Sequence, residues 1–176
     1  GEAIPADLVV VGIGVLPNAE LAAEAGLAVE NGIAVSETCA TSDPRVVAAG
    51  DCASFPWRGG RIRLESVQNA IDMAEAAALT LLDRPAPYDP VPWFWSDQYD
   101  VKLQIAGLAR DWDRVVARPG ARPGTQAHFY FLGPELVAVD ALSDPRAYMT
   151  AKRWLEAGLS PDPEALADPA TDLRSL

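Results

Sequence analysis

Four prolines between residues 84 and 92 divide the chain into two stretches with different hydrophobic patterns. Proline fixes φ and removes a backbone donor, so this segment can continue neither a helix nor a central strand. Before it, apolar runs alternate with helix-like patterns, whereas several short strand-like segments follow one another after it. The sequence therefore predicts a stiff connection between an α/β part and an α+β part.

The α/β part opens on Leu8–Val11, an uninterrupted aliphatic run. Such a run predicts a strand covered on both faces, as in a parallel sheet. We expect Asn18 to cap a helix over 19–25 that ends at Gly26. Few later residues can supply neighbours for the first strand, and the chain does not begin with Met. We therefore expect this chain to be the C-terminal part of a larger protein, with an upstream remainder.

Three further elements are expected before the connection. Asn31-Gly32 between apolar residues predicts a hairpin over 27–35. A second buried strand over 45–49 ends abruptly at Gly50-Asp51. Ser66 is suited to cap a long helix from Val67 to about Asp83. Its apolar stripe, which is rich in alanine, permits close packing on a sheet or a ligand: Ala70, Ile71, Ala74, Ala77, Ala78, Leu81 and Leu82.

Beyond the connection, antiparallel strands are expected over 101–106, 114–117, 127–132 and 136–141. A helix is expected over 144–157, because Pro145 suits its first turn and Gly158 its end. The tail over 160–176 predicts short capped turns.

Composition excludes several classes of protein. The formal charge of −11 argues against nucleic acid as a partner, and no apolar run is long enough for a membrane span. Two cysteines, Cys39 and Cys52, cannot form a disulfide framework and lack the spacing of a redox pair, so a reducing, cytoplasmic compartment is expected. The single histidine, His128, is interpreted as structural, and no metal site is predicted.

Asp51 is the first candidate for chemistry, because ligands of open α/β sheets bind beyond the carboxyl ends of strands. A plain turn cap is the alternative for this residue. Likewise, Ser66 can begin an ordinary helix or one whose free N–H groups face a ligand. The run Trp93-Phe94-Trp95 can serve packing or a cofactor. The residues by themselves leave these alternatives open.

Four motifs in order carry a family resemblance. Residues 41–53, with Val46-Val47-Ala48-Ala49-Gly50-Asp51 at their centre, resemble the second FAD-binding motif of pyridine-nucleotide-dependent flavoprotein reductases. Residues 9–18 are similar to the last strand and exit turn of the NAD(P)H domain. Residues 65–70 and 92–99 narrow the resemblance to ferredoxin reductases of bacterial oxygenase systems, the putidaredoxin and rhodocoxin reductase type.

The resemblance implies a partial FAD/NAD(P)-binding Rossmann-like segment followed by an antiparallel-sheet reductase C-terminal domain. Its boundaries would be 1–17 for the tail of the NAD(P)H domain, 18–83 for the closing segment of the FAD domain, and 84–176 for the C-terminal domain. Asp51 matches the residue that binds the FAD ribityl chain, Val67 a backbone contact, and Trp95 a tryptophan beside the flavin. The implied cofactor-binding residues are Gly50, Asp51, Ser66, Val67, Gln68 and Trp95.

The resemblance also implies an electron path from NAD(P)H, with NADH favoured, through FAD to a [2Fe–2S] ferredoxin that serves an oxygenase. The flavin carries this chemistry, so no side chain here is expected to be catalytic. An isolated, flavin-free docking or dimerisation module is the alternative, and the oligomeric state stays open. A different flavoprotein branch, such as an NADH oxidase or a nitrite reductase subunit, is a third reading, disfavoured by the residue 92–98 motif.

Two features bear on this expectation. Gly12-Ile13-Gly14 is followed by Pro17 where a third glycine should stand, so both dinucleotide fingerprints are expected upstream. Arg58, Arg61 and Arg63 lie near the expected flavin edge and could steer an acidic ferredoxin, as could the later Arg110, Arg114, Arg118 and Arg122. The alternative is that these arginines pair with nearby acids.

Overall fold

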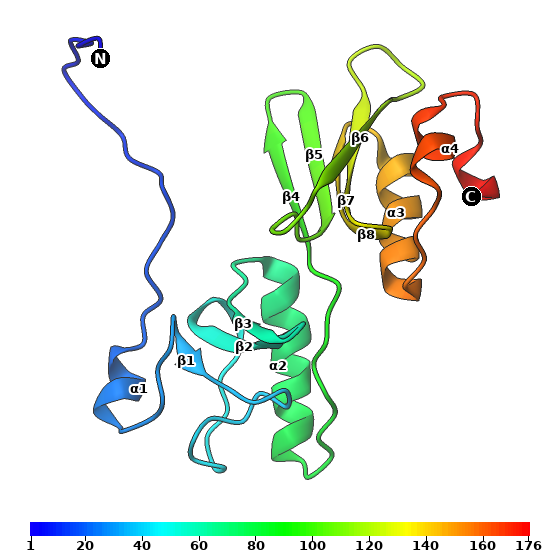
Figure 1. The fold of residues 1–176 in the computed structure, drawn as a ribbon. Coiled ribbons are helices and arrows are strands. Elements are labelled where there is room, and N and C mark those ends of the chain that lie inside the picture. The colour runs from blue at the N-terminus through cyan, green and yellow to red at the C-terminus, as the bar shows by residue number, and fades with distance from the viewer.

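Two hydrophobic cores form, one on each side of the proline-rich connection. A computed structural model describes all of residues 1–176 (Figure 1). The first core is built around Phe55 and Met73, and the second around Phe129 and Phe131, all four with no exposed surface. We call residues 19–83 the first unit and residues 93–176 the second unit. The predicted order, an α/β segment followed by an α+β domain, is confirmed.

The first unit contains α1 (Glu20–Glu24), β1 (Ile33–Ala34), the short 3₁₀ helix η1 (Gly50–Cys52), β2 (Ala53–Trp57), β3 (Gly60–Ile62) and α2 (Val67–Leu81). Its small sheet has the order β1-β2-β3, with β1 parallel and β3 antiparallel to β2. Arg58 and Gly59 join β2 to β3 with φ of 44° and 76°, the positive values that two-residue hairpins need.

Helix α2 begins where the sequence predicted, because the Ser66 side chain accepts a hydrogen bond from the Asn69 N–H at 3.2 Å. Of the predicted apolar stripe, only Ala77 is buried. The buried residues are Asn69, Met73 and Ala77, one turn apart, whereas Ile71 is 49% exposed. The buried face of α2 is the one that packs on the first core, and most of the alanine-rich stripe is not buried.

Leu8–Val11 forms no strand. The segment is extended, unpaired and 69–85% exposed, and in Figure 1 the N-terminal stretch runs clear of both units. A strand exists only with a hydrogen-bonding neighbour, and residues 1–176 offer none to this run. The aliphatic pattern identified a residue set suited to burial, but not the partner it requires.

Two predicted strand pairings are reduced to single bridges, and one predicted helix cap is absent. The predicted hairpin over 27–35 shrinks to one bridge between Val29 and Ile33, although Asn31 and Gly32 do make a left-handed turn. The predicted strand over 45–49 shrinks to the bridge Ala40–Val47. Asn18 does not cap α1, whose N-cap is Ala19 without a side-chain hydrogen bond.

The second unit is a five-stranded antiparallel sheet of order β4-β5-β8-β7-β6. Its strands are β4 (Trp93–Gln98), β5 (Val101–Gly107), β6 (Arg114–Pro119), β7 (Gln126–Leu132) and β8 (Glu135–Leu142). The four predicted strands are confirmed. Strand β4 was missed, since its aromatic residues were interpreted only as anchors or cofactor contacts.

Helix α3 (Pro145–Ala157) packs against β8 and β5 (Figure 1). Asp144 caps it by accepting from the Ala147 N–H at 3.1 Å. As predicted, Pro145 opens it and Gly158 ends it, in the left-handed conformation. The tail forms α4 (Pro163–Ala167) and the 3₁₀ turn η2 (Leu173–Ser175), both capped by aspartates. No helix in the structure combines the length and apolarity that a bilayer span requires.

Arg118 holds the tail against the sheet. Its guanidinium donates to the carbonyl oxygens of Leu166, Asp168, Pro169 and Thr171 at 2.6–3.2 Å, and the residue is only 9% exposed.

We expect Arg118→Met to lower the free energy of unfolding of the second unit by about 2–3 kcal/mol, because charged hydrogen bonds are lost and carbonyls are left unpaired. Urea denaturation followed by near-UV circular dichroism measures this. Arg122→Met, in the exposed β6–β7 loop, is the matched control; equal effects of both variants would contradict the assignment.

Both cysteines are free, and Cys39 rather than Cys52 is the fully buried one. Burial raises the pKa of the Cys39 thiol to about 11, so the thiolate is scarce until the pH approaches that value.

We expect iodoacetamide at pH 8 to alkylate the half-buried Cys52 first and Cys39 only after denaturation. Peptide mapping by mass spectrometry distinguishes the sites, and equal rates for both thiols in the folded chain would contradict this.

Candidate functional site

The Gly50-Asp51 turn packs directly on the first turn of α2. Gly50 has φ of 78°, and a Cβ at this position would lie 3.3 Å from the Ala70 Cβ. Glycine is therefore required here both by conformation and by the close approach. Asp51 follows in η1 with an exposed side chain that forms no ion pair within the chain. Its carboxylate is available as an acceptor beside α2.

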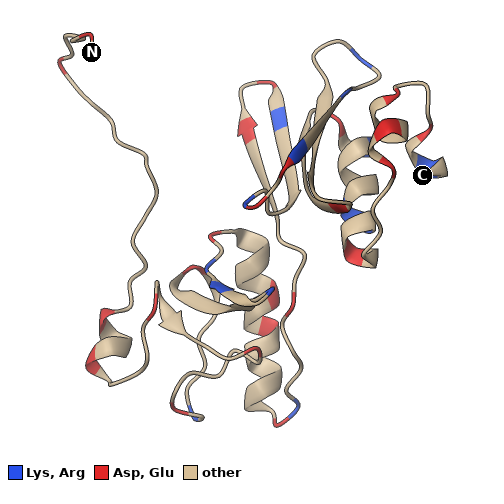
Figure 2. Cartoon of the chain, viewed as in Figure 1, with Lys and Arg blue, Asp and Glu red and all other residues tan.

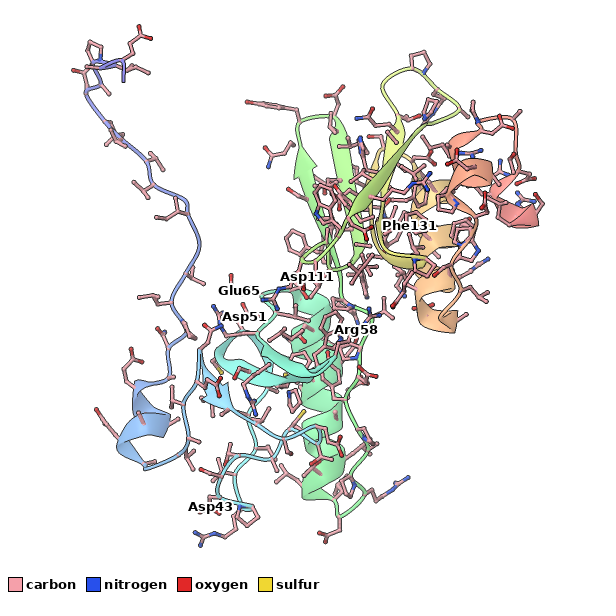
Figure 3. All side chains as sticks on the ribbon, viewed as in Figure 1. Asp43, Asp51, Arg58, Glu65, Asp111 and Phe131 are labelled. Atoms are coloured by element: carbon pink, nitrogen blue, oxygen red, sulfur yellow. The ribbon has the colours of Figure 1, made fainter.

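Arg63 joins this turn to the residue before the helix cap. Its Nη1 donates to the Asp51 backbone oxygen at 3.0 Å and to Glu65 Oε1 at 2.5 Å. Figure 3 shows Asp51 and Glu65 together at the end of the first unit that faces the second unit. The acid-bearing turn and the start of α2 are thus held side by side.

The N-terminus of α2 has backbone donors to offer. The Asn69 N–H is taken by the Ser66 side chain, and the Ala70 N–H by the Ser66 carbonyl at 3.0 Å. The N–H groups of Val67 and Gln68 have no acceptor in the chain. Together with the dipole of a 15-residue helix, they give this point a partial positive charge. The Gln68 side chain bonds Asp72 at 2.5 Å, so only its backbone faces the site.

A buried network fixes the start of α2 in place. Asn69 Nδ2 donates to the Leu64 carbonyl at 3.1 Å, and the Tyr88 hydroxyl donates to Asn69 Oδ1 at 2.9 Å. Burial, with the nearby Asp72 carboxylate as a second cause, raises the pKa of Tyr88, which therefore stays a protonated donor. Sequence reasoning assigned neither residue a role. An asparagine three positions after a serine cap, on a helix face otherwise apolar, was the available signal.

The connection returns along α2 and delivers β4 to its N-terminal end (Figure 1). Tyr88 packs edge-on against Phe55 at 5.2 Å between ring centroids, and Trp57 Nε1 donates to the Pro90 carbonyl at 3.1 Å. A cleft of about 190 Å³ results between the two units. Its lining includes Leu64, Glu65 and Ser66 on one side and Trp93 and Phe94 on the other.

Trp95 lies one residue beyond that cleft. It pairs with Gln104 of β5, contacts Trp93 at 5.7 Å between ring centroids, and is 36% exposed. Because side chains alternate along a strand, Trp95 shares a face of β4 with Trp93, and its ring also lies 6.3 Å from the Phe94 ring between centroids. The structure therefore gathers Gly50, Asp51, Ser66, Val67 and Gln68 at one end of α2, and places Trp95 on the neighbouring strand, where Phe94 reaches the cleft.

The arginines expected near this edge serve internal contacts. Arg61 Nη1 donates to the carbonyls of Val35 and Ser54 at 2.9 and 2.6 Å. Arg58 stacks on the Trp57 ring, with its guanidinium carbon 4.8 Å from the ring centroid. It also forms an ion pair of 3.3 Å with Glu135 of the second unit. Figure 2 shows how the charged residues are distributed over the chain. The alternative from the sequence was that these arginines pair with nearby acids. It holds, because Arg61 also lies 3.7 Å from Glu30 and Arg63 pairs with Glu65, so these two arginines form no free basic patch.

His128 stands opposite Asp140 in the β7–β8 ladder, and Asp140 accepts from the Tyr130 hydroxyl at 2.7 Å. Burial, with this hydrogen bond as the second cause, raises the pKa of Tyr130 to about 12. Glu135, the acid nearest in sequence, pairs with Arg58 instead. The histidine therefore lies in the strand framework of the second unit, as predicted.

These residues fit a planar group that carries both hydrogen-bond acceptors and hydroxyl donors. The free amides of Val67 and Gln68 can meet acceptors, preferably with negative charge, and the Asp51 carboxylate can accept from hydroxyls. The isoalloxazine ring and ribityl chain of FAD offer both. The chain can thus form one side of a flavin site, and its sequence contains no complete Gly-x-Gly-x-x-Gly fingerprint for the pyrophosphate.

Two family models match separate parts of the chain. The pyridine nucleotide-disulphide oxidoreductase family matches residues 1–74, and the reductase C-terminal family matches residues 93–176. The unmatched residues between them contain the proline-rich connection.

Curated relatives match over nearly the whole chain but only part of their own length. Rhodocoxin reductase of Rhodococcus erythropolis is 47% identical over 99% of this chain and 41% of its own length. Putidaredoxin reductase of Pseudomonas putida is 38% identical over 100% of this chain and 42% of its own. The chain thus spans about two-fifths of the length of these relatives.

Two solved structures match the fold of nearly the whole chain. A ferredoxin reductase from Rhodopseudomonas palustris, 42% identical, superposes with a TM-score of 0.93 over 99% of this chain and 44% of its own. The reductase in a covalent putidaredoxin reductase–putidaredoxin complex, 39% identical, has a TM-score of 0.89 over 99% of this chain and 42% of its own. The chain therefore joins a segment of the pyridine nucleotide-disulphide oxidoreductase family, residues 1–74, to a reductase C-terminal domain, residues 93–176.

Proposed function

We propose that this chain is part of an NAD(P)H:ferredoxin oxidoreductase, in which it closes the FAD site and contributes the C-terminal domain. The observation that carries the proposal is the juxtaposition of the Asp51 carboxylate with the two unpaired amides at the N-terminus of α2. Relatives named as reductases of ferredoxin-type proteins support the reaction class.

In this proposal each residue has a defined task. Asp51 accepts hydrogen bonds from the ribityl hydroxyls, and Gly50 lets that turn approach α2. Ser66 caps the helix, so that the amides of Val67 and Gln68 point at the pyrimidine side of the ring. Trp95 shields the ring from the neighbouring strand β4. When bound, FAD supplies the change between two-electron and one-electron transfer.

The chain's own residues bias this chemistry electrostatically. Helix α2 presents its positive end, which favours negative charge on the bound ring by about 0.5–2 kcal/mol. The residues present contribute no acid, base or nucleophile aimed at the cleft, since Glu65 is paired with Arg63. Binding, orientation and exclusion of water are therefore the tasks of this chain.

The finer assignments follow the resemblance. We propose that the boundaries are 1–17, 18–83 and 84–176, that NADH is the donor, and that a cytoplasmic [2Fe–2S] ferredoxin serving an oxygenase is the acceptor. Support for the acceptor comes from the covalent complex of a 39% identical relative with putidaredoxin. The direct test of the acceptor is to measure ferredoxin binding while the complete protein is titrated with ferredoxin and reduced nucleotide.

A flavin-free docking module is the second candidate. The chain's lack of a complete pyrophosphate fingerprint favours it for residues 1–176 in isolation. Absorbance of the purified chain in the flavin bands separates the two: a yellow protein that reduces dyes with NADH has a complete flavin site, whereas a docking module would be colourless.

Asp51→Ala should weaken FAD binding in the protein expressed from its complete reading frame. Loss of charged hydrogen bonds to the ribityl chain predicts roughly a tenfold to hundredfold higher Kd for FAD. Titration of apoprotein by flavin fluorescence measures it. Glu75→Ala, which removes an exposed carboxylate from the middle of α2, is the control and should leave the Kd unchanged. Unaltered affinity in Asp51→Ala would sink the proposed flavin site.

Val67→Pro tests the helix amides without disturbing the helix. Proline is favoured at the first helical position, and the preceding Ser66 is already extended with φ of −144° and ψ of 147°. The variant should keep its melting temperature as apoprotein but bind FAD roughly two- to tenfold more weakly, because one donor is removed. Val67→Ala keeps the amide and should bind normally. Equal affinity of the two variants would show that this amide does not contact the cofactor.

A further inference from the structure

We propose that Arg63 is a positioning residue of the flavin site: it fixes the Asp51 turn against the start of α2 and cancels the charge of Glu65 there. The inference rests on the proposed function, since it concerns the site that would hold FAD. It gives Arg63 a role different from the ferredoxin contact that its sequence position predicted.

One guanidinium holds both parts of the site. Arg63 Nη1 lies 3.0 Å from the Asp51 backbone oxygen and 2.5 Å from Glu65 Oε1. Asp51 belongs to the turn that leaves residue 50, and Glu65 immediately precedes the cap of α2. The distance between the Asp51 carboxylate and the free amides of α2 therefore depends on this bridge.

The surroundings of Arg63 keep it in this role. Its side chain is only 10% exposed, and its Nε lies 3.5 Å from Asn31 Oδ1. A Cβ on Gly32 would lie 3.0 Å from the Arg63 Cδ and 2.6 Å from the Cys52 carbonyl oxygen. Gly32, with φ of 113°, thus leaves room for the arginine stem, so the Asn31-Gly32 turn forms one wall of its slot.

Arg63 also sets the local charge. Two carboxylates, Asp51 and Glu65, lie beside the start of α2, and the single cation between them pairs with Glu65. Without Arg63, Glu65 would be uncompensated at a helix N-terminus that has to favour negative charge on the reduced ring. The residue is therefore expected to affect the binding of reduced FAD more than that of oxidised FAD.

The test uses the FAD-loaded protein from the complete reading frame. Arg63→Met should raise the Kd for FAD about tenfold, since charge-assisted hydrogen bonds are lost. It should also shift the two-electron reduction potential to a more negative value. A further tenfold loss of affinity that is confined to reduced FAD corresponds to a shift of about 30 mV in this potential. The visible circular dichroism of the flavin should change with the altered turn.

Companion variants separate charge from geometry. Arg63→Met combined with Glu65→Gln should return the potential toward its original value but leave the affinity low, because the Asp51 carbonyl is still unheld. Arg63→Lys should keep the potential while restoring only part of the affinity, since one ammonium cannot keep the two Nη1 contacts and the Nε contact with Asn31 together. Glu65→Gln alone should shift the potential to a more positive value, and it decides the charge effect if Arg63→Met does not load FAD.

Arg146→Met is the matched control. It breaks the exposed Arg146–Asp172 ion pair of 2.5 Å in the second unit and should change none of these quantities. If Asp51→Ala weakens FAD binding while Arg63→Met changes neither affinity, potential nor dichroism, the positioning role is overturned and the flavin site stands. If neither variant affects FAD, the proposed function itself fails.

Discussion

The hydrogen bond between the Tyr88 hydroxyl and Asn69 Oδ1 underlies the arrangement of everything near the cleft. Asn69 is 5% exposed and satisfies the Leu64 carbonyl and the Ser66 hydroxyl at the same time. Tyr88 belongs to the connection, so one buried network fixes both the start of α2 and the path of the chain into β4. A buried polar network of this kind specifies a single geometry, because any other leaves a group unpaired.

Apart from this network, few contacts join the two units. Leu108 of the second unit packs against the first core, Arg58 pairs with Glu135, and Trp57 bonds Pro90 in the connection. Exposed ion pairs contribute less than about 1 kcal/mol, so the Arg58–Glu135 pair is a minor part of the junction. The position of β4 beside α2 therefore follows mainly from the anchored connection.

Local signals in the sequence predicted most of the second unit and the start of α2. Ser66, Asp144, Pro145 and Gly158 act through neighbours in the chain, and the alternating residues of β5 to β8 find their partners within residues 93–176. The predicted strand over Leu8–Val11 does not form, because residues 1–176 offer it no hydrogen-bonding neighbour.

The candidate site was predictable only in part. The motif around Asp51 and the cap at Ser66 identified two positions that the structure brings together, although their contact with a cofactor stays a prediction. Arg63 was misjudged, because nothing in its local sequence shows that its side chain lies under a glycine turn. The Tyr88–Asn69 contact spans 19 residues, a separation that periodicity cannot reveal.

The unpaired aliphatic stretch at Leu8–Val11 has a consequence for the handling of this chain. Extended backbone with free N–H and C=O groups, flanked by exposed Ile4, Ile13 and Leu16, is a template to which another extended chain can add. In concentrated solution, this ribbon would thus be a site for intermolecular β-addition. Aggregation would begin at the N-terminus while both folded cores stayed intact.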